Sequence, residues 1–484
     1  MKENFEEKLT ESSVAARLVA FSLPFLMANF LQTLYGMADL FIAGQFNGAD
    51  VITAVSIGSQ IMHMITVIIA GLAMGTTVLT ARAVGAGKER DAGLCAGNSL
   101  LAFLIFSVFA TAILFVFCPQ VVSLMHTPPE AVGETLSYLG ICFLGIPFIS
   151  LYNSVSAVFR GAGDSKRPLY FVAASCLVNI ILDIVFMGPL ALGSRGAALA
   201  TVLSQAFSAF LAAFVLFARG KRGACGETLG GASGGADGRS GACGSSGACV
   251  RILRGDFRMD AKVLKALLQI GLPVSAQDGF IQVSFLVITI IANSRGLSVA
   301  AAVGIVEKII CFLFLVPSSM LSAISALAAQ NMGASLHARA RHTLYAGMAI
   351  AAAFGALFAL AFQFASVPFV SLFTHDAEVV QLGAQYLRSY VFDCFFAAFH
   401  FAFSGFFCAY GYSLLSFVHN TVSILLVRIP GAYLAAKYFP GTLYPMGWAP
   451  AIGSLLSSLI CLGFYLLLKR NGKFGGGLER HGGK

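Results

Sequence analysis

The sequence has few charged residues for its length. Only 11% of its 484 residues are Asp, Glu, Lys or Arg, and the mean hydropathy is +0.83. An ordinary soluble domain has about 25% charged residues, so a water-soluble protein of this size is excluded. Long apolar runs, instead of short alternating strands, favour helical membrane spans over a β-barrel. The expected fold class is an all-α integral membrane protein.

Motifs of enzymatic and metal chemistry are also missing. The eleven Cys form no CxxC pair and no HExxH occurs, so no metal site, organic cofactor or catalytic centre is expected and the protein is not predicted to be an enzyme. Gly85 to Glu89 lacks the first Gly and the Ser or Thr of a phosphate-binding loop, which leaves an ion gradient as the energy source. His400 and His419 are expected to be satisfied core histidines, and Asp393 and Arg428 to form local ion pairs or to snorkel toward the membrane surface.

Twelve apolar segments can each cross a bilayer, which takes about 20 residues. The predicted helices are centred near Phe30, Met64, Phe106, Phe148, Leu177, Phe207, Phe280, Phe312, Phe354, Phe396, Leu426 and Leu456. They divide the chain into an N-terminal tail (1–13), an N-lobe of helices one to six (14–218), a Gly-rich linker (219–262), a C-lobe of helices seven to twelve (263–469) and a C-terminal tail (470–484).

The net charge of +9 is a signal of membrane orientation. Of the 31 Lys and Arg, 25 fall on the side of the predicted topology that holds both termini and the linker. Because cytoplasmic connections are rich in Lys and Arg, both termini are expected in the cytoplasm of a multi-pass protein of the cell (inner or plasma) membrane. No basic stripe interleaved with aromatic residues suggests a nucleic-acid partner, and no obligate protein partner is implied; the lipid bilayer is the expected surrounding.

The two lobes resemble each other at an offset of 248 residues. Ala54 to Ile57 matches Ala302 to Ile305, Ala81 to Ala86 matches Ala329 to Ala334, and Gly163 matches Gly411. Six helices per half preserve orientation, so the repeat predicts a parallel duplication around a pseudo-two-fold axis. Such a pair of bundles is typical of alternating-access transporters. Pro24 and Pro273 lie within the first helix of each half, where either a static kink or a moving hinge is possible.

Three polar residues of the N-lobe have no counterpart in the repeat. Asp39, Asn179 and Asp183 map onto Val287, Val427 and Gly431. Gln32, Tyr35 and Asp39 share one helix face, and Asn179 and Asp183 are one turn apart on another helix. A charged carboxylate inside a membrane costs about 2.5 kcal/mol or more, so the two acids are predicted to share a proton or bind a cation.

The arrangement resembles the multidrug and toxic compound extrusion (MATE) family. The resemblance is carried by Pro24 and Gln32 to Asp39 in helix one, Arg82 to Gly87 after helix two, Phe159 to Asp164 after helix four, Asn179 to Asp183 in helix five, and Gly196 to Thr201 opening helix six. It implies a secondary antiporter that exports amphipathic, often cationic, small organic molecules in exchange for inward H⁺ or Na⁺.

In members of the DinF-like branch, the positions that match Asp39, Asn179, Asp183 and Thr201 form the coupling-cation site, which could take Na⁺. The resemblance also places Tyr138 in the same region, and we predict a substrate cavity that includes Gln32, Tyr35, Tyr138 and Asn153. The alternative function is a flippase for a lipid-linked saccharide or another lipid-like substrate. Such a flippase should have a basic central cavity, for which only Lys308, Arg388 and Arg428 are candidates.

Overall fold

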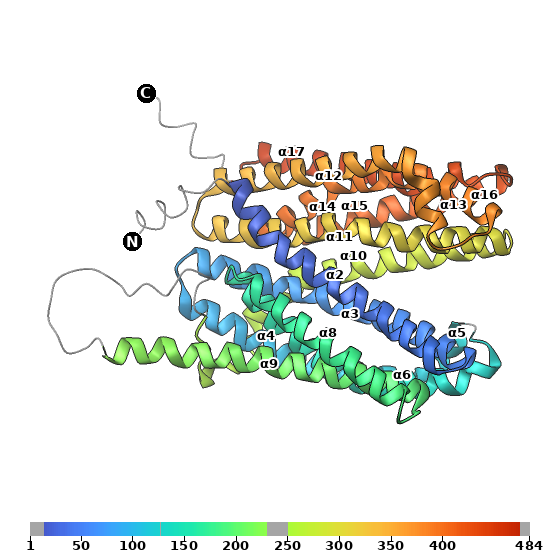
Figure 1. Cartoon of the computed structure of the whole chain (residues 1–484). Coiled ribbons are helices and arrows are strands. Elements are labelled where there is room, and N and C mark those ends of the chain that lie inside the picture. The colour runs from blue at the N-terminus through green and yellow to red at the C-terminus, as the bar shows by residue number, and fades with distance from the viewer. Residues whose placement is uncertain (1–13, 126, 230–249, 475–484) are drawn as a thin grey trace. The chain divides into compact units, whose positions relative to one another are not determined.

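The computed structural model describes residues 14–125, 127–229 and 250–474, and in this part of the chain all regular secondary structure is helical (Figure 1). The elements of the first half are α2 (Val14–Phe46), α3 (Ala49–Gly85), α4 (Glu89–Val116), α5 (Cys118–Leu124), η1 (Pro129–Ala131), α6 (Val132–Leu144), α7 (Ile146–Gly161), α8 (Lys166–Met187), α9 (Gly193–Leu229) and η2 (Arg254–Asp256).

The second half begins with a helix as long as α2 and follows a similar order. Its elements are α10 (Ala261–Asn293), α11 (Leu297–Gly333), α12 (His337–Ser371), α13 (Ala377–Tyr390), α14 (Phe392–Tyr410), α15 (Ser413–Ser423), the π-helical η3 (Ile424–Arg428), α16 (Ile429–Tyr438) and α17 (Tyr444–Arg470).

The predicted twelve spans are confirmed. Among the described residues, eleven helical segments are long and apolar enough to cross a membrane, and the pair Pro129–Leu144 and Ile146–Gly161 makes a twelfth that is bent by 44°. The bend falls at Gly145, just before Pro147, whose missing N–H cannot continue the preceding helix. Large apolar side chains such as Phe214 (71% exposed) and Phe364 (80% exposed) cover the outside, as a lipid-facing surface requires.

The internal repeat extends to the backbone. Helices α3 and α11 each have 37 residues, and their first residues are 248 positions apart. The first residues of α4 and α12 are also 248 positions apart. Gly163 and Gly411 both follow a helix in the left-handed region, with φ of 88° and 81°. The next amide closes the same turn in each half, because Asp164 N donates to Phe159 O at 2.9 Å and Tyr412 N donates to Phe407 O at 2.8 Å. The two halves therefore share one backbone plan.

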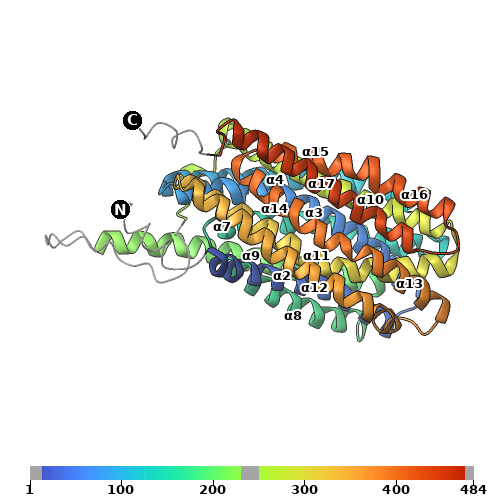
Figure 2. The same cartoon turned by 90° about the horizontal axis from the view of Figure 1, so that it is seen from above.

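Contacts divide the chain into two compact units, one of Pro24–Gly271 and one of Met1–Leu23 with Leu272–Lys484. Within each unit the long helices run roughly alongside one another (Figures 1 and 2). The boundaries lie next to Pro24 in α2 and Pro273 in α10, so the units differ from the predicted lobes at 14–23 and 263–271. A buried cluster that includes Ile69 and Phe143 forms much of the first unit's core, and one that includes Ile310 and Tyr390 does so in the second.

Part of the predicted linker lies within the described residues. Helix α9 continues to Leu229, and residues 230–249 of the linker lie outside the described residues. After them, Val250 is buried against α4 and α7. Asp256 is fully buried and accepts a 2.7 Å hydrogen bond from Arg90 Nη1. The last part of the linker is thus fixed to the first unit.

Candidate functional site

Asp39 of α2 and Thr201 of α9 meet inside the first unit. Asp39 is 2% exposed and Thr201 7% exposed. The Thr201 hydroxyl donates to Asp39 Oδ2 at 3.4 Å, and the other carboxylate oxygen, Oδ1, has no hydrogen-bond partner among the described residues. One oxygen of a buried acid therefore remains available to a ligand.

Helix α8 supplies the other two predicted residues. Its buried side chains recur every three or four positions from Pro168 to Met187 and include Asn179 and Asp183, so one stripe faces the interior. Both residues are fully buried, and within the described part of the chain neither side chain has a hydrogen-bond partner. They lie close enough to Asp39 to interact with it electrostatically. The structure thus brings together the four residues predicted as the coupling-cation site.

This cluster can hold a cation or a proton. It offers two carboxylates, an amide and a hydroxyl, which are the hard oxygen ligands that alkali and alkaline-earth cations prefer. Two buried carboxylates at close range repel each other when both are charged, and unpaired buried polar atoms cost free energy. A shared proton or a bound Na⁺ would remove both penalties. Groups of three or more His, Cys, Asp and Glu side chains suited to a transition metal do not occur in the described residues.

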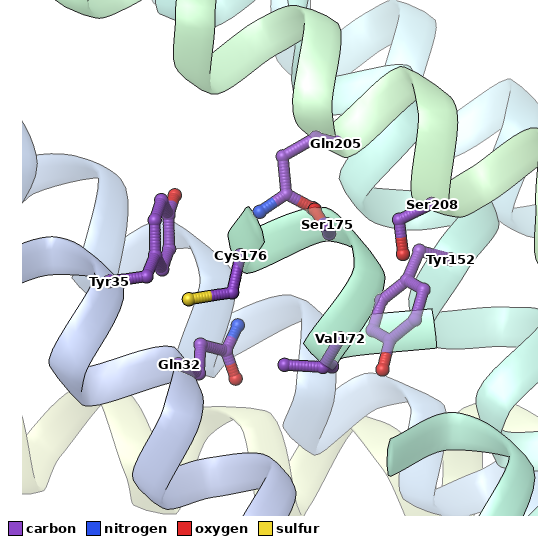
Figure 3. Close-up of a pocket in the computed structure, with 8 residues that line it drawn as sticks. All are labelled: Gln32, Tyr35, Tyr152, Val172, Ser175, Cys176, Gln205 and Ser208. Carbon is purple, nitrogen blue, oxygen red and sulfur yellow. The ribbon is translucent and has the colours of Figure 1, made fainter. Parts of the chain in front are cut away.

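A polar pocket lies in the same unit (Figure 3). Its empty space, open solvent included, is about 290 Å³, and it is lined by Gln32 and Tyr35 of α2 and by residues of α7, α8 and α9. Figure 3 shows the Gln32, Tyr35 and Gln205 side chains around the same opening, with the Cys176 sulfur between the two α2 residues. Amide and phenol groups can donate and accept hydrogen bonds, so the pocket can orient a polar organic molecule.

Two residues predicted for the cavity do not line this pocket. Tyr138 is 1% exposed and belongs to the apolar core of the unit, where its ring packs against Gly58; it lies close enough to Asp39 and Tyr35 to interact with them electrostatically. Asn153 is 7% exposed, and its amide nitrogen donates to Ile149 O at 2.9 Å. Neither side chain lines the pocket of Figure 3.

Several lining residues were missed by the sequence reasoning. Gln205 stands one helical turn after Thr201 and Ser208 one turn further, so the 3.6-residue period places all three on one face of α9. That spacing was the signal that could have found them. Tyr152 of α7 also lines the pocket, and its hydroxyl donates to Pro168 O at 3.3 Å.

Comparison with known proteins gives a consistent result. The family model described as MatE matches twice, at residues 24–185 and 273–434, and so reproduces the internal repeat. The chain is 25% identical over 385 residues to the probable multidrug resistance protein YoeA of Bacillus subtilis, covering 79% of this chain and 78% of that protein. It is 24% identical to a protein of Shewanella oneidensis named FAD transporter, covering 95% of each chain.

Solved structures share the fold. The structure of a MOP superfamily transporter from Pyrococcus furiosus superposes with a TM-score of 0.83 at 22% sequence identity, covering 96% of this chain and 97% of that one. The agreement over nearly the whole length of both chains supports the twelve-helix architecture.

Proposed function

Because the chain belongs to the MatE family of membrane transporters, we propose that it is a secondary active antiporter. It exports amphipathic, often cationic, organic compounds in exchange for inward H⁺ or Na⁺, by alternating access between its two halves. The name of the multidrug resistance relative supports the export of small organic molecules. The name of the FAD transporter indicates that cargo differs among relatives. The proposed activity is transport without covalent chemistry on the cargo.

The buried carboxylate pair carries this proposal. Asp39 and Asp183 have three oxygens without hydrogen-bond partners in the described residues, in a chain whose helices span a membrane. Each charged carboxylate in such a place costs about 2.5–3.5 kcal/mol, and mutual repulsion adds to that cost. A purely structural pair would be expected to have its oxygens satisfied. The arrangement is instead suited to a group that gains and loses a cation in each cycle.

Coupling follows from the position of Asp39 on α2. The same helix carries Gln32 and Tyr35 into the polar pocket and contains Pro24 at the unit boundary. Cation binding neutralises the acids and changes how α2 packs against α8 and α9, so it favours one of two conformations. A cargo that favours the other conformation weakens cation binding by the same factor by which the cation weakens cargo binding.

The test uses proteoliposomes that contain Asp39→Asn or Asp183→Asn protein. A fluorescent cationic dye is loaded, and Na⁺ and pH gradients are imposed separately. We expect wild-type efflux under one of the two gradients, and at least a tenfold loss in each variant. Asp50→Asn changes an exposed acid of α3 and should leave efflux unchanged.

Two results would contradict the proposal. Normal gradient-driven efflux in both variants would remove the role of the acids. Absence of dye efflux from wild-type protein that carries a lipid-linked saccharide after purification would favour the flippase instead.

A further inference from the structure

The second unit contains its own pocket. Its empty space, open solvent included, is about 400 Å³, and its walls come from α10, α11, α14, α15, η3 and α17. Figures 1 and 2 show where these helices lie in the second half of the chain. Phe285 and Phe314 supply apolar surface, while Arg428, His400, Asn420 and Ser423 supply polar groups. The role proposed for the carboxylate cluster of the first unit does not depend on this second pocket.

The repeat relates this pocket to that of Figure 3. Four lining positions of one pocket correspond to four of the other at the offset of 248 residues: Tyr152 and His400, Val172 and Asn420, Ser175 and Ser423, and Cys176 and Ile424. The duplicated fold therefore forms the same cavity in each half. Its chemistry differs, because the second copy has the amide of Asn420 where the first has Val172, and Arg428 where the first half has Ile180, while His400 takes the place of Tyr152.

The donors of the second pocket are buried and incompletely satisfied. Arg428 is 7% exposed; its Nη2 donates to the Tyr390 hydroxyl at 2.9 Å, and its guanidinium lies 4.6 Å from the centre of the Phe285 ring. Arg428 Nε, His400 Nδ1 and Asn420 Nδ2 have no hydrogen-bond partner in the described residues. The expectation that His400 is satisfied is therefore wrong at Nδ1, whereas His419 contacts the hydroxyls of Ser404 and Ser457.

Of the two alternatives expected for Arg428, ion pairing or snorkelling, the ion pair does not occur in the described residues, because none of their three ion pairs involves Arg428, Asp393 or Glu307. Asp393 accepts a hydrogen bond from Ser454 and Glu307 accepts one from Thr289. The second carboxylate oxygen of each acid, Asp393 Oδ2 and Glu307 Oε1, has no hydrogen-bond partner in the described residues. Neither acid lines the pocket, so Arg428 is the one charged side chain among its lining residues. The two acids interact with Arg428 electrostatically from a distance, and its Nε keeps no hydrogen-bond partner in the described residues.

We propose that this pocket binds the anionic head, a carboxylate or phosphate, of an aromatic exported molecule. Arg428 and Asn420 donate hydrogen bonds to the head, because charged acceptors make the strongest hydrogen bonds with a guanidinium. Phe285 and Phe314 contact the apolar body of the molecule. The identification of the ligand as cargo rests on the proposed export function; the binding chemistry does not.

Equilibrium binding to the purified full-length protein tests the proposal. The probes share one ring system and differ in the head: 2-naphthoate, 2-naphthyl phosphate and the neutral methyl 2-naphthoate, measured by isothermal titration calorimetry. We expect at least one anion to bind more than tenfold tighter than the ester, and the tighter anion identifies the head. Arg428→Gln should weaken anion binding about ten- to a hundredfold, the effect of losing a charged hydrogen bond, and leave ester binding unchanged.

Further variants make the result independent of any folding defect in Arg428→Gln. Asn420→Leu and His400→Phe should each weaken anion binding several-fold. Arg388→Gln is the matched control, since Arg388 donates to Ser366 at 2.8 Å and lies outside the pocket. Equal binding of ester and anions to the wild type, or unchanged anion binding in all three pocket variants, would overturn the proposal. These measurements need no ion gradient, so a failure of the antiport proposal leaves them unaffected.

Discussion

At the scale of single residues, a substitution of Thr201 distinguishes between Na⁺ and H⁺ as the coupling ion. It donates to Asp39 at 3.4 Å and also presents an oxygen to the carboxylate cluster. If Na⁺ is the ion, Thr201→Val removes a ligand, and the Na⁺ concentration for half-maximal efflux should rise about threefold to tenfold. If H⁺ is the ion, the same change removes a bond that stabilises the charged carboxylate, and the pH profile of efflux should move to higher pH.

The matched control for this prediction lies one turn away on the same helix. Ser204 is fully buried and donates to Thr201 O at 2.9 Å, but no hydrogen bond joins its side chain to the described acids. Ser204→Ala should leave both the Na⁺ dependence and the pH profile in place. Efflux kinetics that are identical in wild type and Thr201→Val would mean that Thr201 takes no part in ion binding.

At the scale of secondary-structure elements, α4 packs closely against the last part of the linker at its glycines. A Cβ on Gly97 would lie 2.6 Å from the backbone oxygen of Asp256, so only glycine permits this approach. Gly97→Ala should displace the segment, strain the Arg90–Asp256 pair and lower stability by roughly 1–3 kcal/mol. The measurement is the unfolding temperature in detergent, expected to fall by several degrees.

Gly140 of α6 provides the comparison for that substitution. A Cβ there would meet only Phe115 at 4.0 Å, an ordinary contact distance. Gly140→Ala should be neutral or slightly stabilising, since Ala favours helix over Gly. Equal unfolding temperatures for the two alanine variants would show that the segment adapts without cost.

The positions of the helices along the sequence were more predictable than the contacts between helices. Hydropathy located the spans because each needs about 20 apolar residues, but it could not show the 44° bend at Gly145, which is a local backbone effect within one apolar run. The spacing of Asn179 and Asp183 identified a shared face, and the structure places that face against Asp39. The Arg428 pocket was missed because Arg428 was expected to form an ion pair or to snorkel, and only packing shows that Asp393 and Glu307 accept hydrogen bonds from hydroxyls and form no ion pair with it in the described residues.

At the scale of the whole molecule, the duplication conserves backbone conformation even where the residue has changed. Gly87 and Ser335 are related by the repeat and have φ of 69° and 63°. A left-handed conformation costs about 1–2 kcal/mol for a residue with a Cβ. Ser335→Gly should therefore stabilise the protein by about 1 kcal/mol, and Gly87→Ala should destabilise it by a similar amount. Thermal unfolding of the two variants checks the opposite signs; shifts of the same sign would contradict the assignment.

The distribution of Lys and Arg predicts how the whole molecule lies in the membrane. In the topology expected from the sequence, the side that holds the termini is rich in Lys and Arg. It includes Lys88 and Arg90 at the start of α4, and Arg339 and Arg341 at the start of α12. The loop before α11, on the other side, carries only Arg295. Because positively charged connections stay in the cytoplasm, green fluorescent protein fused to the C-terminus should fluoresce in a bacterial host. Alkaline phosphatase should be active when fused after Arg295 and inactive at the C-terminus. The reverse pattern would contradict the expected cytoplasmic location of both termini.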